Sequence, residues 1–356
     1  MKQAILLLLL LFCFLFSEGQ VFSVSGVVKD SDGETLPSAT IFLDGPEKKT
    51  ATNDKGEFKL GGLAPGTYQL TVHFIGYKTW KQNVLIRDKS VNVEVKMETS
   101  EKVLNEVVIT NKATNSKYLQ IFRQNFLGDT ENGRTCMIIN PRILKFSEQG
   151  PYVIAKTKGF LEIENRNLGY RIKYLLRDFR INRYNQIASY TGECIFESME
   201  GSEAEKQVWK ENRRIAYQGS LMHYMRSVYR GSTDQEGFYY YRIKDAKKQT
   251  QQIDTKKLGR DNIVASKDST FVNIKFPEPL YVFRDTSTVR NQVEATDEER
   301  ITNSLNNKSG SIMELYLNEA IVDAKGSIID YRSFLIKGLW GTRRIGDQLP
   351  FEYQPD

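Results

Sequence analysis

Between residues 24 and 97 the chain alternates apolar and polar side chains in several short runs. One run places Tyr68, Leu70, Val72 and Phe74 on one face and Gln69, Thr71 and His73 on the other. A second run repeats the pattern with Val91, Val93 and Val95. Period-two alternation is typical of strands with one buried face, and several such strands need a second sheet to cover them. The segment is therefore predicted to be a β-sandwich.

Turn signals separate these runs, among them Asp54-Lys55-Gly56 and Pro65-Gly66. The run Asp30-Ser31-Asp32-Gly33 has two interpretations, a calcium loop or a plain turn. A calcium loop needs an acidic ligand at its twelfth position, and this run lacks one. The sequence therefore favours the plain turn.

The motifs of this segment occur in a recognisable order. They are Ser25-Gly26-Val27-Val28, Asp32-Gly33, Leu36-Pro37-Ser38-Ala39-Thr40-Ile41, Thr52 with Gly56-Glu57-Phe58, Leu63-Ala64-Pro65-Gly66-Thr67-Tyr68 and Ile75-Gly76-Tyr77. In order and spacing they resemble the carboxypeptidase regulatory-like domain over about 80 residues. The resemblance implies a seven-stranded prealbumin-like or immunoglobulin-like sandwich, which serves as an accessory module and carries no hydrolytic site.

The first residues have the layout of a secretory signal. Lys2 precedes an unbroken apolar run from Ala4 to Phe16, and Ser17-Glu18-Gly19 follows with small residues at the cleavage positions. A membrane anchor is the rival interpretation, but spanning a bilayer takes about 20 apolar residues. Lipid attachment at Cys13 is a second alternative, although Cys13 follows Phe12 rather than a small residue. We expect cleavage near Gly19 and export to the periplasm or the outer membrane of a bacterial envelope.

The domain boundaries follow from these patterns. We expect a signal peptide at 1–19, the regulatory-like sandwich at 20–99, a linker at 100–116 and a second domain of unknown function at 117–356. In related proteins a segment like Leu104–Thr110 joins such a sandwich to an outer-membrane transporter. About 245 residues follow Thr110, too few for a plug and a 22-stranded barrel. A small barrel stays arithmetically open, but long lipid-facing alternations are missing.

The second domain is predicted to be β-rich with inserted helices, so the whole chain is mainly β with an α+β second part. Tyr118, Phe122 and Phe126 indicate a helix that ends at Gly128. Strands are predicted at residues 170–177, 238–243, 271–276 and 333–339. A long helical stretch at 203–230 breaks near Gly219-Ser220, where Ser220 can cap the second half.

The candidate binding residues lie on this helical stretch and near the C-terminus. Leu221, Tyr224, Met225 and Val228 define the buried stripe of the second half, which places His223, Arg226 and Arg230 on the opposite side. Together with Arg213 and Arg214 they could bind an anion, because guanidinium forks match carboxylate and phosphate oxygens. A solvated charged face is the plainer interpretation.

A second candidate patch consists of Trp340 with Arg343 and Arg344. Trp340 is either part of a recognition surface or an aromatic that closes a hydrophobic core, and core aromatics are the commoner case. Asn165–Tyr174, Tyr217–Ser220 and Gly338–Pro350 resemble envelope proteins that carry the same N-terminal domain. That resemblance implies no activity for these positions.

Charge and cysteine content limit the partners and the compartment. From Gln20 to Thr99 ten Lys and Arg balance ten Asp and Glu, so the net charge of +6 belongs to the second domain. An exported basic domain meets glycans, lipid headgroups or acidic proteins, and nucleic acid is not an expected partner. Cys136 and Cys194 either form a disulfide after export or stay separate as small buried side chains. Two cysteines do not define a disulfide framework, which favours the second interpretation.

No catalytic signature occurs in the sequence. A zinc hydrolase needs three protein ligands, and the two histidines, His73 and His223, have no such spacing. A Gly-x-Ser-x-Gly elbow is absent, and we expect no cofactor and no metal. The sequence predicts a non-catalytic envelope module that binds a glycan, a peptide or an envelope protein. A hydrolase acting on an envelope polymer and a structural subunit of an outer-membrane complex are the alternatives.

Overall fold

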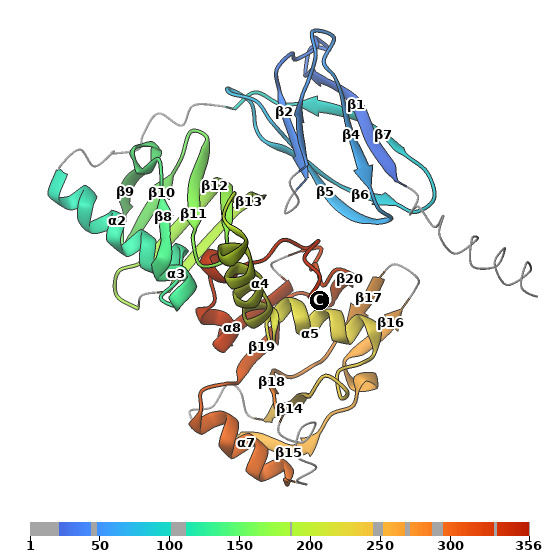
Figure 1. The fold of residues 1–356 in the computed structure, drawn as a ribbon, viewed down its shortest axis with the longest axis vertical. Coiled ribbons are helices and arrows are strands. Elements are labelled where there is room, and N and C mark those ends of the chain that lie inside the picture. The colour runs from blue at the N-terminus through green and yellow to red at the C-terminus, as the bar shows by residue number, and fades with distance from the viewer. Residues whose placement is uncertain are drawn as a thin grey trace, which may run out of the picture. The chain divides into compact units, whose positions relative to one another are not determined.

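The computed structural model describes residues 21–43, 48–100, 112–185, 187–244, 252–267, 271–286, 295–330 and 333–355. They form two compact units, the first from residues 21–43 and 48–100 and the second from residues within 112–355 (Figure 1). The predicted signal peptide at 1–19, the alternative lipid site Cys13 and the segment Leu104–Thr110 lie outside the described residues. None of the described helices has the length and apolar character to span a bilayer.

The described part of the first unit consists of strands joined by turns. The strands are β1 (Phe22–Asp30), β2 (Thr40–Leu43), β3 (Lys49–Ala51), β4 (Glu57–Leu63), β5 (Gly66–His73), β6 (Trp80–Ile86) and β7 (Val91–Met97). They form two sheets, with strand orders β4-β1-β7 and β3-β2-β5-β6. Strands β1 and β7 are parallel, and the other pairs are antiparallel. The predicted seven-stranded sandwich is confirmed.

The alternating residues meet between the two sheets of this sandwich. Leu70 and Val72 of β5 and Val95 of β7 are completely buried and belong to one hydrophobic core. Gly26 allows β1 to approach β7, because a Cβ atom at this position would lie 2.0 Å from the carbonyl oxygen of Val93. The period-two pattern therefore identified the core-facing residues of β5 and β7, although Thr71, which it assigned to the polar face of β5, is completely buried as well.

The Asp30–Gly33 run forms a plain turn. The Oδ1 atom of Asp30 accepts hydrogen bonds from the backbone N–H groups of Asp32 and Glu34, each at 2.9 Å. An Asx-turn is formed when the side chain of an aspartate accepts a hydrogen bond from a backbone N–H group that follows it in the chain. These bonds account for the acidic residue at this position without a metal ion.

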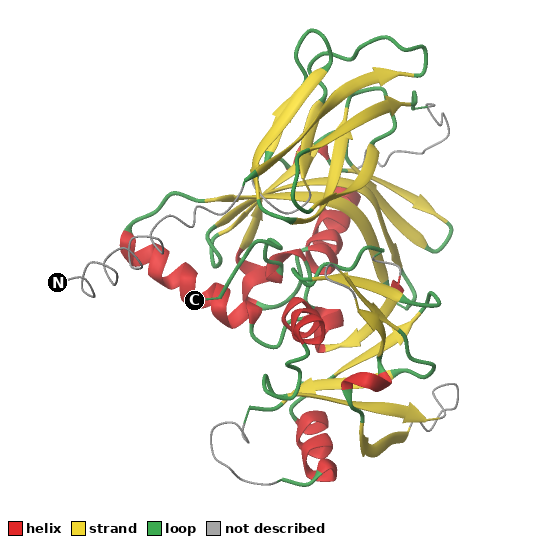
Figure 2. Cartoon of the chain, turned by 90° about the vertical axis from the view of Figure 1, so that its right-hand side faces the viewer, coloured by secondary structure: helices red, strands yellow, loops and turns green. Residues whose placement is uncertain are grey.

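A six-stranded sheet and two helices form the first half of the second unit. The strands are β8 (Cys136–Ile138), β9 (Lys145–Gln149), β10 (Tyr152–Lys156), β11 (Phe160–Asn165), β12 (Tyr170–Asn182) and β13 (Ala188–Ser198). On one edge, strand β12 pairs with β11 along its first half and with β10 along its second half. On the other edge, it pairs with β13 along most of its length. Strands make up much of the described chain, as the yellow arrows of Figure 2 show.

The helix predicted from the aromatic spacing is α2 (Lys112–Phe126), followed by α3 (Glu131–Thr135) and the short 3-10 helix η2 (Pro141–Ile143). Tyr118, Phe122 and Phe126 of α2 are buried in the core of the six-stranded sheet. The ring of Phe122 lies 4.7 Å from those of Phe126 and Phe179. Helix α2 begins inside the segment 100–116 that the sequence assigned to a linker.

The long helical stretch divides into α4 (Glu203–Tyr217) and α5 (Leu221–Arg230), as predicted. Gly219 lies between them with φ of +68°, a left-handed conformation that favours glycine. The side chain of Ser220 accepts the backbone N–H of His223 and caps α5. Tyr224, Met225 and Val228 of α5 are completely buried, so the predicted apolar stripe is confirmed.

Two further sheets complete the second unit. Strands β14 (Phe238–Lys244), β15 (Gln252–Lys257), β18 (Leu280–Arg284), β19 (Ser311–Leu315) and β21 (Phe334–Gly338) form one sheet, in the order β15-β14-β18-β19-β21. Strands β16 (Val264–Lys267), β17 (Phe271–Ile274) and β20 (Ala320–Asp323) form the other, in the order β16-β17-β20. The short helices η3 (Arg260–Asn262), α8 (Leu339–Thr342) and η5 (Ile345–Asp347) connect elements of this region.

Helices pack on these two sheets from different sides. The buried stripe of α5 shares a hydrophobic core with residues of β14, β17, β18 and β20. Helix α7 (Asp297–Asn306) contributes Ile301 to a separate cluster with Tyr241, Tyr281 and Phe283 of β14 and β18. The predicted β-rich second part with inserted helices is therefore confirmed.

Candidate functional site

His223 is buried, contrary to the prediction that it lies on the solvent side of α5. Its exposed fraction is 6%, its Nδ1 atom accepts the N–H of Gly219 at 3.0 Å, and its Nε2 atom lies 2.5 Å from Oε2 of Glu236. Because Nδ1 is an acceptor, the ring proton must lie on Nε2, which donates to the carboxylate. Both ring nitrogens are therefore engaged in bonds within the protein.

The acid that holds His223 is itself strongly stabilised as a carboxylate. Glu236 also accepts hydrogen bonds from Arg230 at 2.9 Å and from the hydroxyl of Ser232. Burial favours a higher pKa for Glu236, but the bonds from His223, Ser232 and Arg230 outweigh burial and lower the pKa to about 2. Burial lowers the pKa of His223, against the opposing effect of the Glu236 carboxylate. A neutral imidazole bonded to a fixed carboxylate is a structural link.

Arg226 is a second error of the helical-face prediction, because its exposed fraction is only 1%. Its Nε atom donates to the carbonyl of Lys325 at 2.8 Å, Nη1 to that of Tyr353 at 2.8 Å and Nη2 to that of Phe351 at 2.9 Å. The guanidinium thus fixes the C-terminal segment and the turn after β20 to helix α5. The apolar stripe was identified correctly, but protein covers the opposite side of the helix as well.

The remaining arginines of the predicted anion-binding face occupy separate environments. Arg213 donates to the carbonyls of Leu168 and Gly169 at 2.6 and 3.0 Å, and its guanidinium lies 3.9 Å from the ring centre of Tyr170. Arg214 is paired with Glu211 at the surface. Arg230 is paired with Glu236. The structure does not bring these side chains and Arg226 together around one opening.

Trp340 lies mostly inside the protein, with an exposed fraction of 7%. Its Nε1 atom donates to the carbonyl of Gly219 at 2.8 Å, and its ring centre lies 5.2 Å from that of Tyr224. Trp340 therefore links α8 to the α4–α5 junction and closes the hydrophobic core of this half. Arg344, its neighbour in the predicted patch, lies over the ring of Tyr190.

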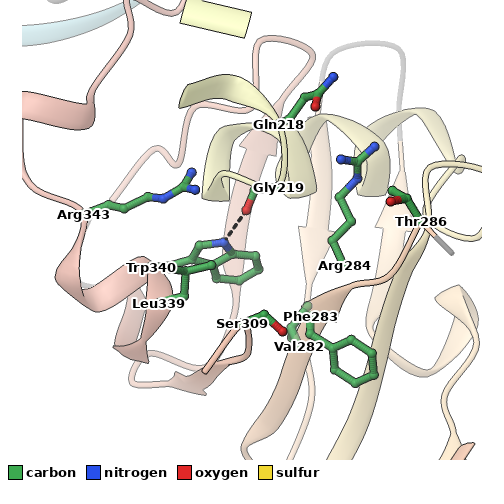
Figure 3. A pocket seen from close by; sticks show the side chains of 10 residues that line it. All are labelled: Gln218, Gly219, Val282, Phe283, Arg284, Thr286, Ser309, Leu339, Trp340 and Arg343. Carbon is green, nitrogen blue, oxygen red and sulfur yellow. Dashed lines mark hydrogen bonds between the residues drawn. The ribbon is translucent and has the colours of Figure 1, made fainter. Parts of the chain in front are cut away.

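A pocket of about 190 Å³ opens beside Trp340, within the second unit. Figure 3 shows Arg343 on one side of the α4–α5 junction, Arg284 on the other and Trp340 at the base. The pocket is lined by Gln218, Gly219, Val282, Phe283, Arg284, Thr286, Ser309, Leu339, Trp340 and Arg343. Two guanidinium groups and no carboxylate line it, so its electrostatic potential favours anions.

Arg343 is the cation of this pocket with the fewest partners. Its Nη1 atom donates to the carbonyl of Ala216 at 3.1 Å, and it forms no salt bridge with any residue that the structure describes. Burial lowers the pKa of the Arg343 guanidinium, while the carboxylate of Asp347 opposes this. A guanidinium stays protonated in proteins, so Arg343 brings a partly desolvated positive charge to the pocket wall. Arg284 differs, because its Nε atom already donates to the carbonyl of Glu236 at 2.9 Å.

Four of the backbone N–H groups around the pocket are used within the fold. Gly219 donates to His223 and Ser220 to the carbonyl of Tyr217 at 2.9 Å. Leu339 donates to the carbonyl of Gly310 and Trp340 to the hydroxyl of Ser311, both at 3.0 Å. An oxyanion hole needs donors that point at the reacting oxygen, and these four amides point elsewhere. The pocket is thus suited to binding through side chains.

The two cysteines lie on different strands of the six-stranded sheet and are present as thiols. Cys136 is on β8, where its sulfur lies 3.2 Å from the carbonyl oxygen of Asn132, and burial raises its pKa to about 12. Cys194 is on β13, opposite Tyr174 of β12. Since β11 and β12 separate β8 from β13, the disulfide interpretation does not fit this sheet. Their separation agrees with the interpretation that the sequence favoured.

Metal ligands do not gather in the part of the chain that the structure describes. Within those ranges no group of three His, Cys, Asp or Glu side chains could hold a metal ion. His73, on β5 of the first unit, has its Nδ1 atom 3.4 Å from the hydroxyl of Thr79.

Most of the pocket was missed by the sequence analysis. Arg343 and Trp340 were candidates, but Arg284 and Thr286 belong to β18 and the residue stretch after it, and Ser309 precedes β19. These positions are far apart in sequence and carry no local motif. The sequence signals that fall on this place were the candidates Trp340 and Arg343 and the helix break at Gly219-Ser220, which was interpreted only as a helix boundary.

Comparison with known proteins gives one family match. The model of the CarboxypepD_reg-like domain matches residues 24–109. No curated protein matches the chain.

Three of the solved structures that match do so over parts of the chain, at TM-scores of 0.20 to 0.21. A streptococcal ancillary pilin is 17% identical over 23% of this chain and 34% of its own, at a TM-score of 0.21. A 3-chlorocatechol 1,2-dioxygenase from Rhodococcus opacus 1CP is 10% identical over 23% of this chain and 61% of its own, at a TM-score of 0.20. A chain of a type II cohesin–X-dockerin complex from Acetivibrio cellulolyticus is 20% identical over 31% of this chain and 78% of its own, at a TM-score of 0.20.

The chain spans about a third of the length of that pilin, and overlaps of this size say nothing about what it binds. The family match and the two-sheet architecture agree with each other. The first unit of this chain is a carboxypeptidase regulatory-like domain.

Proposed function

We propose that this chain is an exported, non-catalytic binding module of a bacterial cell envelope, which contacts a peptide, a glycan or a neighbouring envelope protein. The sandwich serves as an accessory or docking piece, and the second unit carries the ligand site. The periplasm or the outer-membrane surface is the proposed location, which rests on the signal-like layout of residues 1–19.

The observation that carries the proposal is the composition of the pocket in the second unit. Its lining holds two arginines, two hydroxyls and an amide, but no histidine and no carboxylate. Such a lining can attract and orient an anionic group, yet it has no side chain with a pKa suited to general acid–base catalysis near neutral pH. Binding without turnover is therefore the activity that this site supports best.

The environment of His223 supports the same conclusion. A general base must reach the proton that it removes, and His223 has one nitrogen bonded to Gly219 and the other to Glu236. The alternative of a hydrolase acting on an envelope polymer would need catalytic groups from outside the pocket and outside this pair.

The test uses the mature chain, residues 20–356, with purified envelope fractions. We expect the protein to retain a peptide, glycan or protein component in a saturable manner, and the bound component to be recovered unchanged by mass spectrometry. Product that accumulates with time, and that disappears in a single-residue variant, would contradict the proposal. In intact cells the mature N-terminus should lie near Gly19 or Gln20, and an unprocessed cytoplasmic chain would contradict the proposed location.

A further inference from the structure

We infer that the pocket between Arg284 and Arg343 binds a carboxylate that has a short apolar group beside it. This inference rests on the proposed binding function and specifies its ligand. Arg343 supplies the anchor, because it is partly buried at the wall and its one hydrogen bond within the described protein goes to the neutral carbonyl of Ala216. Among the described residues no carboxylate forms a salt bridge with Arg343, and Asp347 acts on it only through a longer-range attraction. A ligand carboxylate therefore supplies the direct ion pair that this guanidinium lacks.

The donors available in the pocket favour a carboxylate over a phosphate. Phosphate sites commonly combine cations with several backbone N–H groups aimed at the ligand. Here the N–H groups of Gly219, Leu339 and Trp340 are donated to other atoms of the protein. The side-chain donors that line the pocket include the planar fork of Arg343, with Arg284 across the pocket, the amide of Gln218 and the hydroxyl of Thr286. A planar guanidinium matches a planar carboxylate in a bidentate manner.

The size and the base of the pocket define the rest of the ligand. A cavity of about 190 Å³ accommodates a group of amino-acid size and no extended chain. Val282, Leu339 and the indole of Trp340 form an apolar base beside the arginines. Because Trp340 is only 7% exposed, it offers an edge to a small side chain rather than a broad face to a sugar ring. An alanine-like residue with a free carboxylate satisfies both the charge and the volume.

Two sources can provide this chemistry, namely the C-terminal residue of a peptide or a free acylated amino acid. We therefore propose calorimetric titration of the mature chain with four probes. They are N-acetyl-L-alanine, its carboxamide, the peptide N-acetyl-Ala-Ala-Ala with a free C-terminus, and the same peptide with an amidated C-terminus. Inorganic phosphate at equal concentration is the control for a general anion site.

The free acids should bind and their amides should bind at least about 10-fold more weakly, since the amide cannot neutralise Arg343. Tighter binding of the free-acid peptide than of N-acetyl-L-alanine supports a peptide C-terminus as the source. Equal affinity supports a free acylated amino acid. Equal binding of acid and amide, or phosphate binding as tight as that of the acids, would overturn the inference.

Variants locate the site on the molecule. Arg343→Gln should weaken acid binding by at least about 10-fold, and Arg343→Lys, which keeps the charge but loses the fork, by a smaller factor. Arg344→Gln is the matched control, because Arg344 is the next residue, does not line the pocket and lies over the ring of Tyr190. Melting curves establish that each variant is folded, and the acid–amide comparison on the unchanged protein needs no variant.

Unaltered acid binding in folded Arg343→Gln would overturn the assignment of the site. Failure of all carboxylate probes would also overturn it. The proposed function fails separately, because it requires that the mature chain retain an envelope component whether or not a carboxylate is involved.

Discussion

In the first unit the ion pairs Lys29–Glu94 and Lys78–Glu98 lie at the surface, with side chains between 39% and 78% exposed. In the second unit Arg226 is 1% exposed and donates to three carbonyls far along the chain. The sandwich thus places its charges in water and closes an apolar core, whereas the second unit uses buried charge to fix irregular backbone. A buried carbonyl without a hydrogen-bond donor costs free energy. Arg226 is therefore needed where the regular hydrogen bonding of helices and strands ends.

The largest effect that we expect comes from removing such a charge. Arg226→Met keeps much of the side-chain volume but leaves the carbonyls of Lys325, Phe351 and Tyr353 without their donor. The free energy of unfolding of the second unit should fall by about 3–5 kcal/mol. Urea denaturation followed by Trp fluorescence in a Trp80→Phe background would measure it.

Arg214→Met is the control, because Arg214 pairs with Glu211 at the surface. Its effect on the free energy of unfolding should be small, because an exposed ion pair contributes little to stability. Equal effects of the two substitutions would show that burial of the guanidinium does not distinguish these arginines.

The first unit should respond instead to loss of apolar volume. Leu70 is completely buried between the two sheets, so Leu70→Ala should reduce the stability of the sandwich by about 2–4 kcal/mol. Hydrogen exchange measured by mass spectrometry should show faster exchange in the strands of the sandwich and unchanged exchange in the second unit. Asn83→Ala, at an exposed position of β6, should leave exchange unchanged. Faster exchange in both units would show that the sandwich is not an independent cooperative unit.

Acid should distinguish the two units through His223 and Glu236. The pKa of Glu236 is about 2 in the folded protein against an ordinary 4.5, so its stabilising effect is complete above about pH 4.5 and is lost toward pH 2. The pKa of His223 is also lowered, so protonation of the unfolded chain adds a loss of stability as the pH falls below 6.5. The second unit should therefore lose up to about 3 kcal/mol between pH 6.5 and pH 2.

Denaturation curves across this pH range would measure the loss. Glu236→Gln should be less stable at neutral pH and less sensitive to acid than the unchanged protein. If this variant kept the full acid sensitivity, the carboxylate would not be its source.

The smallest effect concerns the turn after β1. Asp30→Ala removes the acceptor of two exposed backbone hydrogen bonds and should cost the sandwich about 1 kcal/mol. Asp30→Asn keeps an acceptor oxygen and should recover most of this loss. Addition of calcium should change the melting temperature of neither protein, and a calcium-dependent rise would restore the metal-loop interpretation.

The sequence predicted the first unit well because its information is local. Tyr68, Leu70 and Val72 alternate with polar residues, and this alternation identified the face of β5 that joins the hydrophobic core. It did not show that Thr71, on the other face, is buried as well. The cap at Ser220 and the stripe of Tyr224 and Val228 in α5 are local in the same sense.

The sequence could not predict what covers the other side of α5. Arg226 bonds to residues 99, 125 and 127 positions away, and no periodicity within the helix reports partners at such distances. His223 and Arg226 therefore looked like a solvated face. The pocket escaped prediction for the same reason, since Arg284 and Arg343 meet only after folding.

The three carbonyl bonds of Arg226 make it a structural link within the protein rather than part of a ligand site. Hydrogen exchange in the turn after β20 distinguishes these two roles. In this turn the carboxylate of Asp323 accepts hydrogen bonds from the N–H groups of Lys325 and Ser327, and Arg226 donates to the carbonyl of Lys325. Arg226→Met should accelerate exchange of these amides by at least about 10-fold, and Arg214→Met should not. Unchanged exchange in Arg226→Met, together with loss of binding to an envelope component, would show instead that Arg226 belongs to a ligand site.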